Sequence, residues 1–164
     1  MSGDDELFEV RMLDMPLVLR ERSRQQGADL LREMTLIRTG QADHTTSHEV
    51  PRRLLKLAHE LDTFYGPYIA SSTQEMDAAL DRGEDTYDEV VYRLPPQSVA
   101  FVQHVADILS EVEDYCRSDG YLLILAPPAD IAAYRHWSIN EVLRQHAGRP
   151  PTPWPVYAAA HGLR

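Results

Sequence analysis

The sequence has few of the residues that fix a fold by covalent chemistry. Its 164 residues include a single cysteine, Cys116, and a single lysine, Lys56. A lone cysteine excludes an internal disulfide and hence a disulfide-rich secreted fold. No apolar run approaches the roughly 20 residues of a membrane-spanning helix. The acidic start, MSGDDELFEV, has no signal-peptide core. We therefore expect a soluble, cytoplasmic protein.

Recognised catalytic and cofactor signatures are also missing. The eight glycines are scattered singly, and neither GxGxxG nor GxxxxGK[ST] occurs, so the sequence predicts no phosphate-binding loop. No GxSxG nucleophile motif is present. The zinc patterns HExxH and CxxC are absent too. The sequence therefore predicts no cofactor and no metal, and it favours a non-catalytic protein over an enzyme.

Acidic side chains are abundant and unevenly distributed. Sixteen basic and 26 acidic residues give a net charge of −10. Residues 57–130 alone hold three basic and fifteen acidic side chains. Such a segment repels phosphate backbones, so we expect no nucleic-acid partner. It is typical of solvated acidic helices, and it would also attract a basic protein partner.

The hydrophobic pattern predicts a mostly helical α/β or α+β domain with a small sheet of about three strands. Leu7–Leu13 and Tyr87–Leu94 alternate apolar and polar residues, the period of a half-buried strand. Residues 121–126 are apolar throughout, as in a strand covered on both faces. The predicted order is β-α-α-α-β-α-β-α. Residues 1–149 form one globular domain, and the proline-rich residues 150–164 form an extended tail.

Helix boundaries follow from proline, glycine and the apolar period. Asp14 and Pro16 mark the start of a long helix, in which Ser23 and Gly27 thin the apolar stripe where another backbone could approach closely. Gly66-Pro67 is expected to break or kink the helix that Pro51 opens. The remaining helices are expected over about Ser71–Asp81, from Pro96 to Arg117, and Asp130–Ala147.

Three smaller groups have a possible chemical role. His44 and His48 are four residues apart and could hold zinc, although their polar segment reads as a solvated loop. Cys116 precedes Arg117, which would lower a thiol pKa, but its place on an apolar stripe favours burial. Aromatic residues could line a ligand pocket. They are Tyr65, Tyr68, Tyr134 and Trp137.

The last long helix has the most informative side chains. A tryptophan beside a polar ladder is typical of a recognition surface, because tryptophan and arginine are enriched in binding hot spots. Trp137 would be the anchor of this partner-binding surface. Its full set is Arg135, Trp137, Asn140, Glu141 and Gln145, with Trp154. The alternative is that the tail, through Trp154 and its prolines, covers Trp137.

Several stretches together resemble one group of small actinobacterial proteins. The stretches are VRMLDMPLVLRER, LLREMTLI, VPRRLLKLAHELDTFYG, MDAALDRGE, DYC with LLILAPP, and YRHWSINEVLRQHAGRPPTPWP. The genes of that group lie near anti-sigma-factor kinases, PP2C-type phosphatases and STAS anti-anti-sigma factors. The resemblance implies a role in stress-response partner switching, with one of those proteins as the partner. It supplies no catalytic residues.

Three functions of different classes follow. The first is a non-catalytic cytoplasmic regulator that binds a signalling protein. The alternative is a small-molecule sensor domain, or an enzyme without a recognisable motif.

Overall fold

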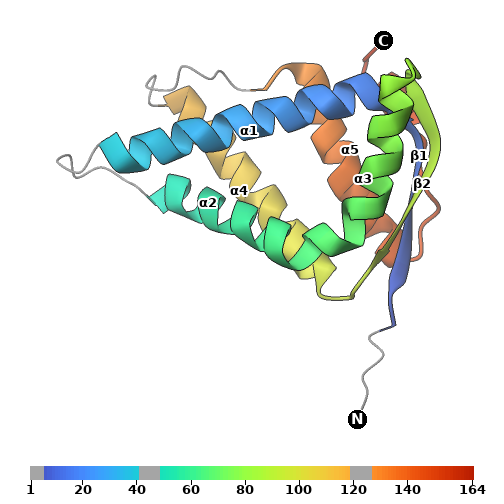
Figure 1. Cartoon of the computed structure of the whole chain (residues 1–164), viewed down its shortest axis with the longest axis horizontal. Helices are drawn as coiled ribbons and strands as arrows, with labels where there is room; N and C mark the ends of the chain where they lie inside the picture. Colours follow the sequence, from blue (N-terminus) through green and yellow to red (C-terminus); the bar gives the residue numbers. More distant parts are fainter. Residues whose placement is uncertain (1–5, 41–48, 119–126) are drawn as a thin grey trace.

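A computed structural model describes residues 6–40, 49–118 and 127–164. Helices dominate these residues, and two strands pair at one end of the molecule (Figure 1). The strands are β1 (Phe8–Pro16) and β2 (Thr86–Leu94). The helices are α1 (Leu17–Gly40), α2 (Glu49–Glu60), the π-helix η1 (Leu61–Tyr65), α3 (Gly66–Asp81), α4 (Ser98–Ser118), α5 (Ala129–His146) and α6 (Trp154–Ala160).

The two strands form an antiparallel ribbon with one apolar face. Their pairing runs from Phe8 opposite Leu94 to Pro16 opposite Thr86. Side chains alternate between the two faces of a strand. Val10, Met12 and Val90 therefore point to the same face, and all three are buried. This face is the floor of the main core.

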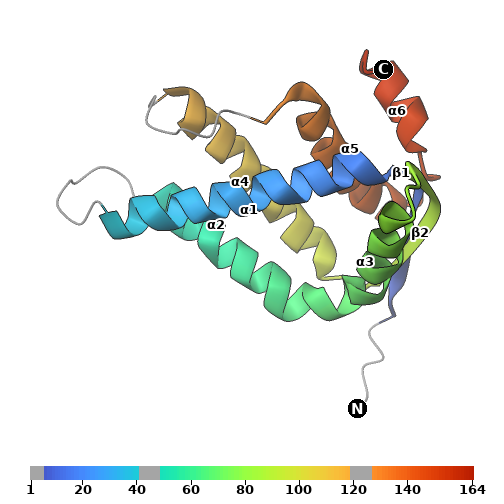
Figure 2. The same cartoon turned by 45° about the horizontal axis from the view of Figure 1, so that its top comes forward.

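The helices separate into two groups around two apolar clusters. The first cluster joins the sheet to α3 and α5 and includes Met76 and Trp137. The second joins α1, α2 and α4 and includes Leu30, Leu57 and Ile108. Helices α1, α2 and α4 extend away from the sheet, whereas α3 and α5 lie beside it (Figures 1 and 2). The molecule thus has a sheet end and a helical end.

The expected strands at residues 7–13 and 87–94 are confirmed, as is the mostly helical composition. The start of the first helix was misplaced. Asp14 has a positive φ of 53° and Pro16 is still paired with Thr86, so the strand continues past Asp14 and the helix begins at Leu17. The predicted third strand at residues 121–126 lies outside the described residues.

The Gly66-Pro67 step changes the helix without interrupting it. Pro67 has no N–H to donate to a carbonyl of the preceding turn, so the regular backbone hydrogen-bond pattern of the α-helix cannot continue there. The chain forms the π-helix η1 just before this point, and Gly66 keeps helical angles, with φ −48° and ψ −49°. The axis turns between α2 and α3 (Figure 1). Downstream, Gly83 follows the end of α3 with φ 82°, the left-handed conformation in which glycine commonly closes a helix.

The tail was expected to be extended throughout, and this is wrong for its second half. Residues 149–153 have no regular structure, but Trp154–Ala160 form the helix α6. Pro155 lies in the first turn of α6, where a helix tolerates proline because that N–H would have no partner in any case. The prolines therefore lead into a helix instead of extending the tail.

Candidate functional site

Trp137, the predicted anchor of a partner surface, lies in the main core. Its side chain has no exposed surface, and its indole Nε1 donates a hydrogen bond of 2.8 Å to the carbonyl of Thr152. Trp154 packs against it edge-on, with ring centroids 5.6 Å apart. Tyr134 contacts both tryptophan rings at 6.1 Å. A buried side chain cannot contact a partner in this conformation, so Trp137 is a packing residue that holds the tail.

Glu141 is also buried, with 1 % of its surface exposed. Its carboxylate accepts hydrogen bonds from the Thr152 backbone N–H at 2.9 Å and from Gln145 Nε2 at 2.8 Å. Arg144 Nη1 donates to the other oxygen at 3.2 Å and to the Thr152 hydroxyl. A buried carboxylate is costly unless it is hydrogen-bonded. These donors satisfy it, and together they fix residue 152 against α5.

The other predicted contact residues divide between the interior and the surface. Gln145 binds the backbone of Arg11 in β1. Asn140 is exposed. Arg135 reaches from α5 to α1, where Nε donates to the Ser23 hydroxyl and Nη2 to the Ser23 carbonyl, both at 3.2 Å. Most residues of the predicted surface therefore lie in the interior. Arg135 belongs to a different site, an apolar cavity.

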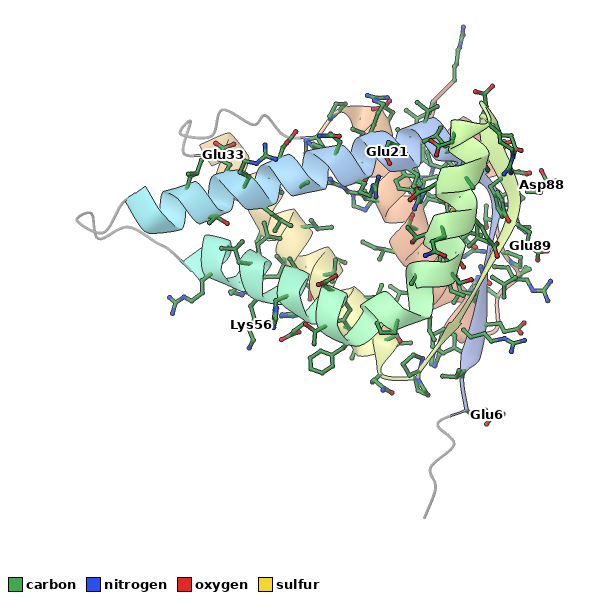
Figure 3. All side chains as sticks on the ribbon, viewed as in Figure 1. Glu6, Glu21, Glu33, Lys56, Asp88 and Glu89 are labelled. Carbon is green, nitrogen blue, oxygen red and sulfur yellow. The ribbon has the colours of Figure 1, made fainter. Side chains whose placement is uncertain are left out.

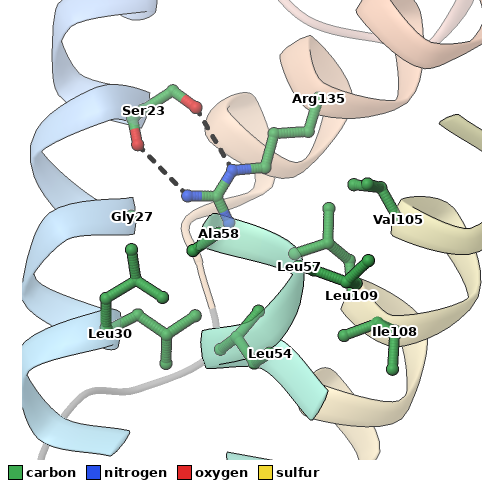
Figure 4. Close-up of a pocket in the computed structure, with 11 residues that line it drawn as sticks. Ser23, Gly27, Leu30, Leu54, Leu57, Ala58, Val105, Ile108, Leu109 and Arg135 are labelled. Atoms are coloured by element: carbon green, nitrogen blue, oxygen red, sulfur yellow. Dashed lines mark hydrogen bonds between the residues drawn. The ribbon is translucent and has the colours of Figure 1, made fainter. Parts of the chain in front are cut away.

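Arg135 lies at one end of an apolar cavity between α1, α2, α4 and α5 (Figure 4). The cavity has a volume of about 240 Å³. Every helix of this group contributes to the lining. The lining residues are Ser23, Gly27, Leu30, Leu31, Leu54, Leu57, Ala58, Val105, Ile108, Leu109 and Arg135. Among them Arg135 is the single charged side chain, so the lining is almost wholly apolar, with one guanidinium at its edge.

The electrostatics of Arg135 leave its charge only partly compensated. Burial lowers the pKa of Arg135 below its ordinary value, and the negative charge of Glu113 acts in the opposite direction. A guanidinium group nevertheless stays protonated near neutral pH. Its hydrogen bonds to Ser23 go to neutral oxygens. Because a buried charge is stabilised by pairing, an anionic group arriving in the cavity would find a favourable position here.

Small residues of α1 make room for this arrangement. A Cβ atom added at Gly27 would lie 3.8 Å from Arg135 Nη2. The sequence marked Ser23 and Gly27 as a place where another backbone could approach α1. The structure places the Arg135 guanidinium there instead. The small residues in the apolar stripe of α1 thus indicated the position of the site, although they did not identify the arginine side chain that packs there.

Two of the four aromatic residues predicted to line a ligand pocket, Tyr134 and Trp137, do not line the cavity. Tyr134 and Trp137 belong to the core at the sheet end, and leucines take the lining positions. The side chains of Tyr65, Tyr68 and Cys116, and all of His44 and His48, lie outside the described residues. Across residues 6–40, 49–118 and 127–164, no group of three or more His, Cys, Asp or Glu side chains is arranged to hold a metal ion.

Within the described part of the chain, no helix combines the length and apolarity needed to cross a membrane. Comparison of the chain with protein families, curated proteins and solved structures gives no match.

Proposed function

We propose that this protein is a non-catalytic sensor whose four-helix cavity binds a small molecule with an apolar body and one anionic group. The observation that carries the proposal is the position of Arg135, a partly compensated guanidinium at the end of a leucine-lined cavity. Ligand sites are typically apolar clefts in which a few polar groups fix the orientation of the ligand. The cavity fits this pattern with one polar end.

The size of the cavity restricts the ligand. A volume of 240 Å³ corresponds to about eight water-sized groups at ~30 Å³ each. A medium-length aliphatic carboxylate such as octanoate has about this size. Its chain would contact Leu30, Leu57 and Ile108, and its carboxylate would meet Arg135. Each buried methylene contributes about 0.8 kcal/mol, so affinity should change with chain length until the cavity is full.

Calorimetric titration with three ligands of the same length tests this assignment. Octanoate is expected to bind most tightly, octanol more weakly, and octylammonium most weakly, because only the carboxylate pairs with Arg135. Arg135→Met should weaken octanoate binding by about tenfold or more, as expected for a charge-assisted hydrogen bond. The same change should leave octanol binding nearly unaltered. Arg52→Met, on an exposed position of α2, removes an equal charge as a control.

A second pair of variants separates the cavity from other apolar surfaces. Ala58→Leu fills the cavity from α2, whereas Ala100→Leu adds the same atoms at an exposed position of α4. Both residue types favour helix, so folding should be little affected. Ala58→Leu is expected to abolish the octanoate-induced rise in melting temperature, and Ala100→Leu to preserve it. If no chain length from hexanoate to decanoate binds, the proposed function is wrong.

The regulatory role that the sequence resemblance implies is compatible with this sensor. We propose that occupancy of the cavity, which is lined by α1, α2 and α4, is reported to a protein partner of the anti-sigma kinase, phosphatase or STAS type. Affinity purification from host cells, with and without added octanoate, tests this role. Recovery of the same partner in a ligand-dependent amount would support it. Recovery of the protein alone under both conditions would contradict it.

A further inference from the structure

The free edge of β1 is closed by a side chain. Gln145 Oε1 accepts a hydrogen bond from the Arg11 backbone N–H at 2.8 Å, and Gln145 Nε2 donates to the Arg11 carbonyl at 2.8 Å. The amide thus takes the place that a peptide group of a neighbouring strand would occupy. Closing an edge in this way prevents another strand from pairing there.

The outer edge of β2 lacks such a cap. Arg11 lies opposite Val91, and its backbone N–H and carbonyl face away from β2. In an antiparallel pair, two facing residues either both hydrogen-bond across the pair or both point their backbone N–H and C=O groups away from it. The N–H and C=O groups of Val91 therefore face the outer edge of β2. The backbone N–H and C=O groups of Glu89 and Arg93, two residues to either side of Val91, face the same edge. Among the described residues we find no side chain that closes this edge as Gln145 closes the other.

The side chains along this edge form a short, regular pattern. Val91 is 38 % exposed, and Glu89 and Arg93 are exposed on either side of it. Glu89 lies on the outer side of β2 (Figure 3). Both charges belong to the outer face of the sheet, where Arg11 pairs with Glu89 at 2.9 Å and Arg93 with Glu9 at 3.3 Å. The pattern is therefore acid, valine, base at spacings of two.

Space for another strand exists beside this pattern. A groove of about 580 Å³ borders β2. Its lining combines the outer face of the sheet with polar residues of α3, namely Ser71, Ser72 and Glu75. We infer that a second copy of this chain pairs with β2 through its own β2, antiparallel and centred on Val91. The two ribbons would then form one four-stranded sheet across a twofold axis.

This register makes the edge complementary to itself. With Val91 opposite the partner's Val91, Glu89 lies opposite the partner's Arg93, and Arg93 opposite the partner's Glu89. Opposite charges in directly facing cross-strand positions are stabilising, and like charges are destabilising. The row Glu9, Arg93 and the partner's Glu89 then alternates in sign across three strands. An unrelated extended peptide would match this pattern only by having the same spacing of charges.

The dimer is expected to be weak. Two chains of net charge −10 repel each other, and one pair of edge strands buries little surface. Interfaces of this size belong to transient complexes, with dissociation constants on the order of micromolar or weaker. Sedimentation velocity of the full chain over a wide concentration range is the suitable measurement. A concentration-dependent monomer–dimer equilibrium is expected.

A charge-exchange experiment tests both the surface and the register. Glu89→Arg alone would place two arginines opposite two arginines in a dimer, and Arg93→Glu alone would do the same with glutamates. Each variant should therefore be monomeric. In a mixture of the two, both charge pairs between the chains become complementary, so a heterodimer should form. The swapped charges are exposed, so the cost to each monomer is below about 1 kcal/mol, and circular dichroism checks that both variants fold.

Two controls make the outcome decisive. Asp62→Arg, an equal charge change at an exposed position of η1, should not form a heterodimer with Arg93→Glu. Val91→Cys in a Cys116→Ser background should form an intermolecular disulfide, because facing residues in a hydrogen-bonded antiparallel pair lie about 5.5 Å apart between Cα atoms. Wild-type protein that stays monomeric up to millimolar concentration, or a mixture that sediments as two separate monomers, would overturn the inference.

Discussion

The sheet end and the helical end of this molecule are packed by different means. At the sheet end, Trp137 is enclosed by Trp154 and Tyr134, and Glu141 and Thr152 satisfy each other's polar groups. At the helical end, leucines from α1 and α2 face a cavity of about 240 Å³ whose charged group is Arg135. One end has its apolar and polar groups paired within the chain, and the other leaves room for an additional molecule.

We expect the close-packed sheet end and the cavity at the helical end to contribute differently to stability and to ligand binding. Protein interiors are normally close-packed, and a void forfeits the dispersion contacts of its lining. A cavity of this size therefore lowers stability unless a ligand restores those contacts. We therefore expect the close-packed sheet end to contribute more to stability than the helical end.

Truncation of a core side chain should cost more at the sheet end than at the helical end. Trp137→Ala is expected to lower the free energy of unfolding by about 3–5 kcal/mol, because the close-packed surroundings cannot fill the void. Leu57→Ala, beside the existing cavity, should cost about 2 kcal/mol, the lower limit for such changes. Urea unfolding of both variants measures the difference. Equal losses would mean that the two ends are packed alike.

Removal of the Glu141 carboxylate should detach residue 152 from α5. Glu141→Ala leaves the part-buried Thr152 N–H and Gln145 amide without their acceptor, at an expected cost of about 2–3 kcal/mol. Glu141→Gln retains one acceptor oxygen and should cost less. Asp88→Ala, at an exposed position of β2, serves as the control and should stay within about 0.5 kcal/mol. Unfolding free energies that do not distinguish Glu141→Ala from the control would contradict this account.

Two glycines should respond to the same substitution with opposite signs. Gly27→Ala adds a methyl group 3.8 Å from Arg135 Nη2 in a helix interior, so a gain of up to about 1 kcal/mol is expected. Gly83→Ala forces alanine to adopt φ 82°, at a cost of about 1 kcal/mol. Thermal unfolding compares the two. A loss of stability in Gly27→Ala would show that α1 and α5 are packed too closely there for any added atom.

The strands were predictable because their apolar residues alternate, as Val90, Tyr92 and Leu94 do. For Trp137 the sequence left two interpretations open, a partner surface and coverage by the tail, because helical spacing cannot tell an exposed polar ladder from a buried one; the tail contacts through Thr152 and Trp154 match the second. Glu141 and Gln145 share a face with Trp137 in either case. Whether this face is exposed or buried depends on its contacts with Thr152 and with β1. These contacts join residues that lie beyond the helix or far away in the sequence.

The cavity was only partly predictable, for a related reason. The sequence identified Arg135 and, separately, the small residues Ser23 and Gly27, but no local pattern brings α5 to α1. The cavity depends on the crossing of four helices, which side-chain volume along the whole of each helix determines. The proline content of the tail predicts an extended chain, but proline is also accepted in the first turn of a helix, and for this reason α6 was not predicted.

The smallest predicted effect concerns the ion pair that joins the two ends. Asp130, in the first turn of α5, accepts a hydrogen bond of 2.6 Å from Arg22 of α1. Desolvation raises the pKa of this carboxyl, but the bonds from Arg22 and from the Ile131 N–H outweigh it, so the pKa lies below its ordinary value. A lowered folded-state pKa stabilises the fold above the unfolded pKa, near 3.9, and this stabilisation disappears as the pH falls through the folded pKa.

Asp130→Asn should therefore cost less than about 1 kcal/mol at neutral pH, since the pair is exposed. The stability difference between wild type and variant should shrink as the pH falls below 4 and should not change between pH 6 and 8. Chemical unfolding at several pH values measures it. High salt should reduce the neutral-pH difference, because exposed charges are screened. A difference that is independent of both pH and salt would mean that the charge of Asp130 does not hold α5 against α1, and that packing alone joins the two ends.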